Sequence, residues 1–195
     1  MKNMRMTNIN RIIFKIHFYV LSFVILNYLV QLITNFGINS SLIFILKLLI
    51  YVSGFTLFFL NKKPFKKLAV YYFYYFISIL TGILFYVFGG IFLAILTSIF
   101  LKPVYPKEIK YQKENLKVYS SFNGFLGACC QYEIVENKLL IFEKYYGKIK
   151  IDGQLESEKS DIKLLNNEVQ YKHKVINFKG ETKIETDTIE IIEMK

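Results

Sequence analysis

Polar side chains interrupt the first two apolar segments of the chain in a regular pattern. Asn27, Gln31 and Asn35 are four residues apart, and Lys47 lies inside the second apolar segment. Residues four apart share one face of an α-helix, so the three amides are expected to lie together. Because amides are costly against lipid, this face should look into a helix bundle or another subunit. The pattern fits either hydrogen bonds that hold helices together or a polar path for an ion or small substrate.

Lys47 has two interpretations of its own. A lysine buried in a membrane marks a functional site by default, and folding the chain back around residue 39 brings Lys47 level with Gln31. Lys47 also lies only about 10 Å from the start of its segment, within snorkelling reach of the interface. Both interpretations stay open from sequence.

Adjacent thiols are the other candidate for chemistry. Cys129 and Cys130 form no disulfide framework, and in a strand they would point to opposite faces, one packed and one exposed. A metal site would need two or three further ligands, and the histidines are only His17 and His173. We therefore expect packing or, alternatively, a reactive thiol, with no metal and no cofactor.

Acidic residues are confined to the second half of the chain. All fifteen Asp and Glu lie at or beyond Glu108, so residues 1–101 contain no carboxylate for a proton relay or an intramembrane hydrolase. The carboxylates of the tail are scattered among lysines, and no Ser-His-Asp or Cys-His pattern stands out. The sequence therefore predicts a protein that is not an enzyme.

The elements that position these residues are apolar segments long enough for a membrane. Spans are predicted at residues 12–34 and 42–60, followed by residues 68–101 without one charge. A helix over that stretch would reach about 51 Å, against about 30 Å of hydrocarbon. Two spans, 68–86 and 88–101, with a reversal near Gly89 and Gly90 are favoured over one overlong helix.

Small and aromatic residues mark the ends of this stretch. Gly90, Ala94 and Ser98 form a small-residue face for helix packing or self-association into a homo-oligomer. Four tyrosines near its start predict an aromatic belt at the membrane interface, namely Tyr71, Tyr72, Tyr74 and Tyr75.

The charge distribution predicts the orientation. Residues 1–101 hold nine basic residues, whereas the remaining sixteen basic and fifteen acidic residues nearly cancel. The positive-inside rule then places the N-terminus and the loop with Lys62, Lys63, Lys66 and Lys67 in the cytoplasm. With four spans the C-terminal domain is cytoplasmic too. Because the basic excess flanks spans, no nucleic-acid partner is expected.

Beyond the spans the pattern changes from helical to β. Residues 103–116 read as a basic linker with Pro103 and Pro106, and residues 117–195 as short strands with turns about every ten residues, one at Glu136-Asn137. The predicted fold is a transmembrane helix bundle followed by an antiparallel β-meander or sandwich.

These patterns favour a multi-pass membrane protein whose β-rich tail binds a protein partner or supports an assembly. The alternative is a small oligomeric channel or transporter with a path lined by Asn27, Gln31, Asn35 and Lys47.

Overall fold

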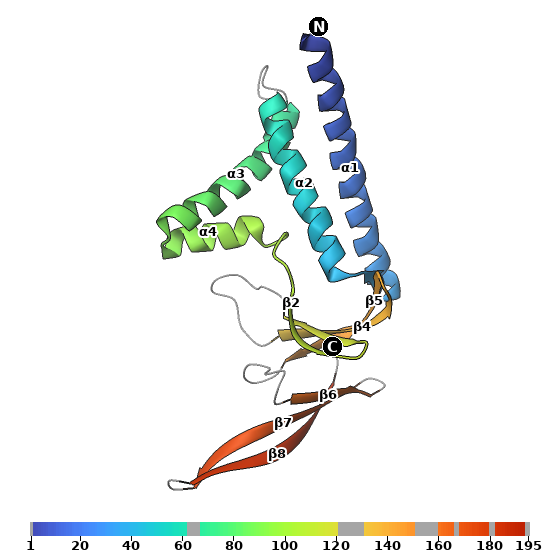
Figure 1. Cartoon of the computed structure of the whole chain (residues 1–195), viewed down its shortest axis with the longest axis vertical. Helices are drawn as coiled ribbons and strands as arrows, with labels where there is room; N and C mark the ends of the chain where they lie inside the picture. The colour runs from blue at the N-terminus through green and yellow to red at the C-terminus, as the bar shows by residue number, and fades with distance from the viewer. Residues whose placement is uncertain are drawn as a thin grey trace. The chain divides into compact units, whose positions relative to one another are not determined.

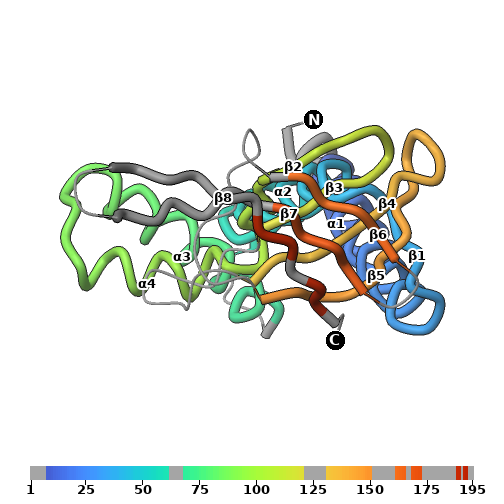
Figure 2. The backbone as a smooth tube through the Cα atoms, turned by 90° about the horizontal axis from the view of Figure 1, so that it is seen from below, coloured from blue at the N-terminus to red at the C-terminus, as the bar shows by residue number. Residues whose placement is uncertain are grey.

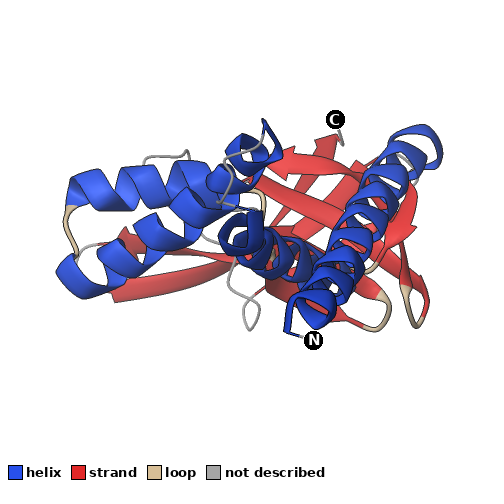
Figure 3. Cartoon of the chain, turned by 90° about the horizontal axis from the view of Figure 1, so that it is seen from above, coloured by secondary structure: helices blue, strands red, loops and turns tan. Residues whose placement is uncertain are grey.

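The computed structural model divides the chain into a helical unit that runs to Pro106 and a β-rich unit that starts at Lys107. Helices are blue and strands red in Figure 3. The structure describes residues 2–61, 67–120, 131–150, 160–165, 168–179 and 182–193.

Four helices make up the described part of the helical unit: α1 (Lys2–Thr34), α2 (Ser40–Asn61), α3 (Lys67–Phe88) and α4 (Ile91–Leu101). A short extended segment, β1 (Phe36–Ile38), joins α1 to α2. Three stretches are long and apolar enough to cross a membrane, and they coincide with the first three predicted spans: Asn8–Thr34, Ser40–Asn61 and Leu68–Phe88.

The uncharged stretch is two helices rather than one. The backbone turns at Gly89 and Gly90, whose φ angles are +65° and +93°. Side chains with a Cβ rarely adopt such values, so the glycine pair is what allows the helix to break here. The chain reverses at this point (Figure 1, Figure 2). The predicted reversal is confirmed, and the overlong single helix is wrong.

α4 runs antiparallel to α3 but is too short for a full crossing. The Thr97 hydroxyl donates to the Thr81 carbonyl at 3.1 Å, and the Tyr74 hydroxyl donates to the Phe100 carbonyl at 3.1 Å. The 11 residues of α4 span about 17 Å, roughly half of the hydrocarbon thickness. The described helices therefore provide three candidate spans and a shorter apolar helix, where the sequence favoured four full spans.

The helical unit buries one face and exposes large apolar side chains elsewhere. Its core contains Ile50 and Leu57 of α2 and Tyr72 and Tyr75 of α3. Outward side chains such as Ile33, which is 82 % exposed, would be unfavourable in water over so wide a surface. Such a surface suits contact with lipid, as expected for membrane helices.

The β-rich unit consists of two antiparallel sheets, as the sequence predicted. In the first sheet the strands pair in the order β5-β4-β3-β2, with bounds β2 (Glu108–Lys113), β3 (Leu116–Ser120), β4 (Gln131–Leu139) and β5 (Phe142–Lys150). In the second sheet the order is β6-β7-β8, with bounds β6 (Ser160–Leu164), β7 (Glu168–Lys179) and β8 (Thr182–Glu193).

The two sheets share one apolar core. Val118 and Ile134 come from neighbouring strands of the first sheet and are fully buried, as is Val169 of the second sheet. Ile162 of β6 and Tyr171 of β7 pack with them. Alternate residues of each strand face this core because successive side chains point to opposite sides of a sheet.

Two strand boundaries differ from expectation. β2 begins at Glu108, inside the segment predicted as a linker. The predicted turn at Glu136-Asn137 is wrong, because β4 continues to Leu139 and the chain reverses at Leu140-Ile141. Turn chemistry favours Asn and Gly at such positions, so two apolar residues gave no local signal.

Candidate functional site

His17 lies at the centre of a hydrogen-bonded network inside the helical unit. Its side chain is fully buried. Its Nδ1 is 2.8 Å from the Oγ of Ser53 on α2, and its Nε2 is 2.9 Å from the hydroxyl oxygen of Tyr71 on α3. One side chain of α1 therefore connects all three candidate spans.

The directions of these hydrogen bonds follow from a backbone carbonyl. The Ser53 hydroxyl lies 3.0 Å from the carbonyl oxygen of Ile50, which can only accept. Ser53 thus donates to Ile50 and accepts from Nδ1–H of His17. The Nε2 is then an acceptor for the Tyr71 hydroxyl, which itself accepts from the Tyr75 hydroxyl at 2.6 Å. This assignment uses both nitrogens of a neutral imidazole.

Tyrosine rings enclose the histidine. The rings of Tyr71, Tyr72 and Tyr75 lie edge-on to the His17 ring, with centroids 5.7, 5.7 and 5.3 Å away. Tyr72 is fully buried and Tyr75 is 6 % exposed, so the predicted interfacial belt is wrong for these two residues. Their positions on α3 face the bundle, where ring contacts with His17 stabilise them.

A second pair of tyrosines holds the end of α4. The hydroxyls of Tyr51 and Tyr74 each donate to the Phe100 carbonyl at 3.1 Å, and their oxygens are 3.2 Å apart. The last carbonyls of a helix have no partner within the helix, so these hydroxyls satisfy one of them. Together the two networks join α1, α2, α3 and α4.

The Ser53–His17 distance resembles that of a nucleophile and its base, but the chemistry differs. The Ser53 proton is donated to Ile50 rather than to the imidazole, and residues 1–101 hold no carboxylate that could orient His17. The geometry therefore favours a network that fixes the helices over one that activates a hydroxyl.

From the sequence alone, His17 is a candidate only as a metal ligand. The sequence of α1 carried no clear signal that His17 faces the bundle, because apolar residues are spread around the whole helix. Only the structure shows that partly or fully buried residues recur every three or four positions: Ile13, His17, Val20, Val24, Asn27 and Gln31. Such spacing is typical of the face that a helix packs against a neighbour.

Two of the predicted polar side chains, those of Asn27 and Gln31, lie at the turn after α1. The side-chain oxygen of Asn27 accepts the Ile38 N–H at 2.9 Å, and the backbone N–H of Asn35 donates to the backbone carbonyl of Gln31 at 2.9 Å. Asn35 adopts a φ of +57°, which asparagine tolerates well. The Gln31 side chain packs against Gly37, where a Cβ would lie 3.3 Å from its Cδ. Asn27 and Gln31 thus support the turn.

The remaining predicted residues of the helical unit are dispersed. Lys47 is half-buried on α2. Ala94 and Ser98 are 6 % and 8 % exposed, so this part of the small-residue face is covered within the chain. Gly90 lies in the turn before α4, where a Cβ would meet open space.

The predicted thiols, Cys129 and Cys130, lie outside the described residues. Among the residues that the structure describes, no three His, Cys, Asp or Glu side chains come close enough to hold a metal ion.

Gly54 lets α2 and α3 approach closely. A Cβ at Gly54 would lie 2.5 Å from Cδ2 and 2.6 Å from Cγ of the buried Tyr75 ring. We expect Gly54→Ala to destabilise the helical unit by about 1–3 kcal/mol because the ring must move in a packed core. Unfolding of the full chain in mixed detergent micelles, followed by circular dichroism, measures this change.

Gly82→Ala is the matched control, since the Cβ there meets only the terminal Cδ1 of Leu101, at 3.2 Å. Alanine is favoured over glycine in a helix by about 0.5–1 kcal/mol, so this variant should be neutral or slightly more stable. Equal stability of the two variants would contradict the close contact.

The β-rich unit contains a buried ion pair. Lys117 Nζ lies 3.4 Å from Glu143 Oε1, and the two side chains are 10 % and 8 % exposed. The Tyr119 hydroxyl donates to the same carboxylate oxygen at 2.7 Å. Burial, together with this hydrogen bond to a carboxylate, raises the pKa of Tyr119. Lys117 and Tyr119 therefore both bind the buried Glu143 carboxylate within the first sheet.

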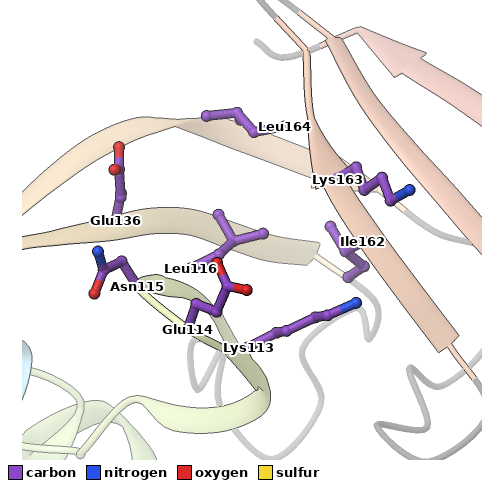
Figure 4. A pocket seen from close by; sticks show the side chains of 8 residues that line it. All are labelled: Lys113, Glu114, Asn115, Leu116, Glu136, Ile162, Lys163 and Leu164. Atoms are coloured by element: carbon purple, nitrogen blue, oxygen red, sulfur yellow. The ribbon is translucent and has the colours of Figure 1, made fainter.

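A shallow pocket of about 390 Å³ lies near the β2–β3 turn (Figure 4). Its lining mixes apolar residues with the opposite charges of Lys113, Glu114 and Lys163. Lys113 pairs with Asp161 at 2.8 Å, and hydrogen bonds from Lys113 and Tyr111 lower the pKa of that carboxyl. Lysines and glutamates both line the pocket, and Lys113 is already paired with Asp161. The described lining therefore has no cluster of like charges that would attract an ionic ligand of the opposite sign.

No protein-family model, no curated protein and no solved structure matches this chain.

Proposed function

We propose that this chain is a membrane-anchored binding protein without enzymatic activity, whose β-rich unit binds a protein partner. The three candidate spans and their exposed apolar surface support the anchoring. The observation that carries the binding role is the exposed edge of the second sheet.

β8 is the outermost strand of that sheet, beside β7. Ile192 packs on the core of the unit, whereas Ile189 and Ile191, on the opposite face of the strand, are 55 % and 61 % exposed. Soluble proteins usually blunt such edges with charge or cover them. β8 also carries five charged residues, and its described exposed apolar side chains lie in the C-terminal part of the strand. The unpaired edge beside Ile189 and Ile191 supports pairing with a strand of another protein.

The length of the β7–β8 ribbon is a second argument (Figure 1). β6 pairs only with Val169–His173, so in the described strands Lys174–Lys179 and Thr182–Asp187 pair with each other alone. A two-stranded ribbon is marginally stable in water. An added strand from a partner would stabilise it.

The charge distribution supports a cytoplasmic N-terminus and a cytoplasmic β-rich unit. In the sequence, Lys62, Lys63, Lys66 and Lys67 lie between the second and third apolar segments, and further lysines follow α4. The reversal between α3 and α4 is consistent with a chain that returns toward the side from which α3 starts.

One labelling experiment tests both location and binding. In a Cys129→Ser, Cys130→Ser background, Ile191→Cys is compared with Gln112→Cys, which is also exposed in the β-rich unit. A membrane-impermeant maleimide should label neither variant in intact cells. In opened cells it should label Gln112→Cys quickly and Ile191→Cys several-fold more slowly, because the partner covers β8. After purification in detergent the two rates should become equal.

Labelling of either variant in intact cells would place the unit outside. A rate for Ile191→Cys that is the same in opened cells and after purification would contradict a partner on β8.

The alternative function, a small oligomeric channel, has less support. Two of its four path residues, Asn27 and Gln31, bond or pack at the turn after α1 through their side chains.

A further inference from the structure

Four consecutive apolar residues project at the end of the β4–β5 hairpin, here called the β4–β5 tip: Leu139, Leu140, Ile141 and Phe142. They are 67 %, 100 %, 51 % and 38 % exposed. Leu139 pairs with Phe142 across the turn, and Leu140 and Ile141 form the turn itself. The most exposed position of the hairpin is therefore occupied by a large apolar side chain.

The apolar side chains of the β4–β5 tip are not needed to fold the hairpin or to pack the β-rich unit. A fully exposed Leu140 makes no packing contact that could stabilise the hairpin. Tight turns between strands favour Asn, Asp and Gly, so polar residues would close this hairpin at least as well. A local sequence that breaks the turn rules without a structural gain is expected at a functional surface.

The carboxylates beside the tip are neutralised. Glu143 is buried against Lys117, and Glu136 accepts a hydrogen bond from Lys138 at 2.8 Å. The pKa of Glu136 is lowered by its bonds to Lys138 and Tyr146, so the carboxyl stays paired as an anion. Lys138 and Lys144 flank the apolar residues on the two strands. The tip therefore combines a projecting apolar end with two flanking lysines, of which Lys138 also pairs with Glu136, and the two described carboxylates beside it, Glu136 and Glu143, both have a lysine partner.

We propose that the β4–β5 tip inserts into the interfacial region of the bilayer that holds the helices. Residues 102–107 are all that separates α4 from β2, and six residues span at most about 20 Å, so the β-rich unit is tethered at its start within reach of the bilayer. Apolar side chains enter the acyl boundary, and lysines bind anionic headgroups. The proposal rests on the membrane anchoring and does not depend on a protein partner.

Depth-dependent quenching in nanodiscs with one full-length chain each tests the proposal. In the Cys129→Ser, Cys130→Ser background, an environment-sensitive fluorophore is attached at Ile141→Cys. The lipid is phosphatidylcholine with phosphatidylglycerol, with and without a doxyl-labelled phosphatidylcholine as quencher. We expect several-fold stronger quenching at Ile141→Cys than at Gln112→Cys, and a return to the control level when Leu140→Asp is added. In pure phosphatidylcholine the quenching should weaken, because the lysines lose their anionic partners.

Tyr19→Cys on α1, which is 72 % exposed, reports that the spans are inserted. Quenching at Tyr19→Cys with none at Ile141→Cys would overturn the proposal and leave the anchoring intact. Leu140 is fully exposed, so Leu140→Asp should fold normally, which circular dichroism checks. Shielding of the Ile141→Cys label that appears only when two chains share a nanodisc, without lipid quenching, would also overturn the proposal in favour of a contact between chains.

Discussion

Replacing Glu143 with alanine should destabilise the β-rich unit by about 3–5 kcal/mol, because Lys117 would stay buried without its counter-charge. The Tyr119 hydroxyl would lose its acceptor at the same time. The free energy of unfolding can be measured by hydrogen exchange of β3, β4 and β5 amides in the full chain. Apolar replacement of both charges, Lys117→Met with Glu143→Leu, should recover more than half of the loss, since no unpaired charge remains.

Glu108→Ala provides the matched control for this prediction. Glu108 pairs with Lys110 at 2.7 Å, but its side chain is 68 % exposed. Exposed ion pairs contribute about 0–1 kcal/mol, so the control should change stability little. A loss at Glu143→Ala no larger than at Glu108→Ala would show that the buried pair is not what the sheet depends on.

His17→Ala should destabilise the helical unit by about 2–4 kcal/mol, through a cavity in the core and the loss of two hydrogen bonds. Ser53→Ala removes only one of the two partners, so a smaller loss of about 0.5–1.5 kcal/mol is expected. Both values can be obtained from unfolding in mixed micelles, monitored by circular dichroism.

Tyr19→Ala tests whether this loss is specific to the network. Tyr19 lies two residues from His17 on the same helix but is 72 % exposed, so its removal leaves no cavity. If His17→Ala and Tyr19→Ala unfold at the same denaturant concentration, the network around His17 is not a determinant of the bundle.

Local patterns were sufficient for the three candidate spans and for the reversal after the third. Apolar runs of about twenty residues predicted the spans, because a helix needs that length to cross hydrocarbon. Gly89 and Gly90 predicted the reversal, because glycine tolerates positive φ where other residues do not. The spacing of Asn27 and Gln31 likewise indicated one helix face, on which both are half-buried.

Tertiary structure alone decided which side chains meet. His17 binds Ser53 and Tyr71, which are 36 and 54 residues away, and Glu143 meets a lysine 26 residues away. Such pairs depend on how helices and strands pack, and neither periodicity nor composition encodes them. The position of the turn in the β4–β5 hairpin was likewise decided by strand pairing rather than by the local sequence. Strand pairing extended β4 through Glu136-Asn137, a local turn signal, and left the reversal to two apolar residues.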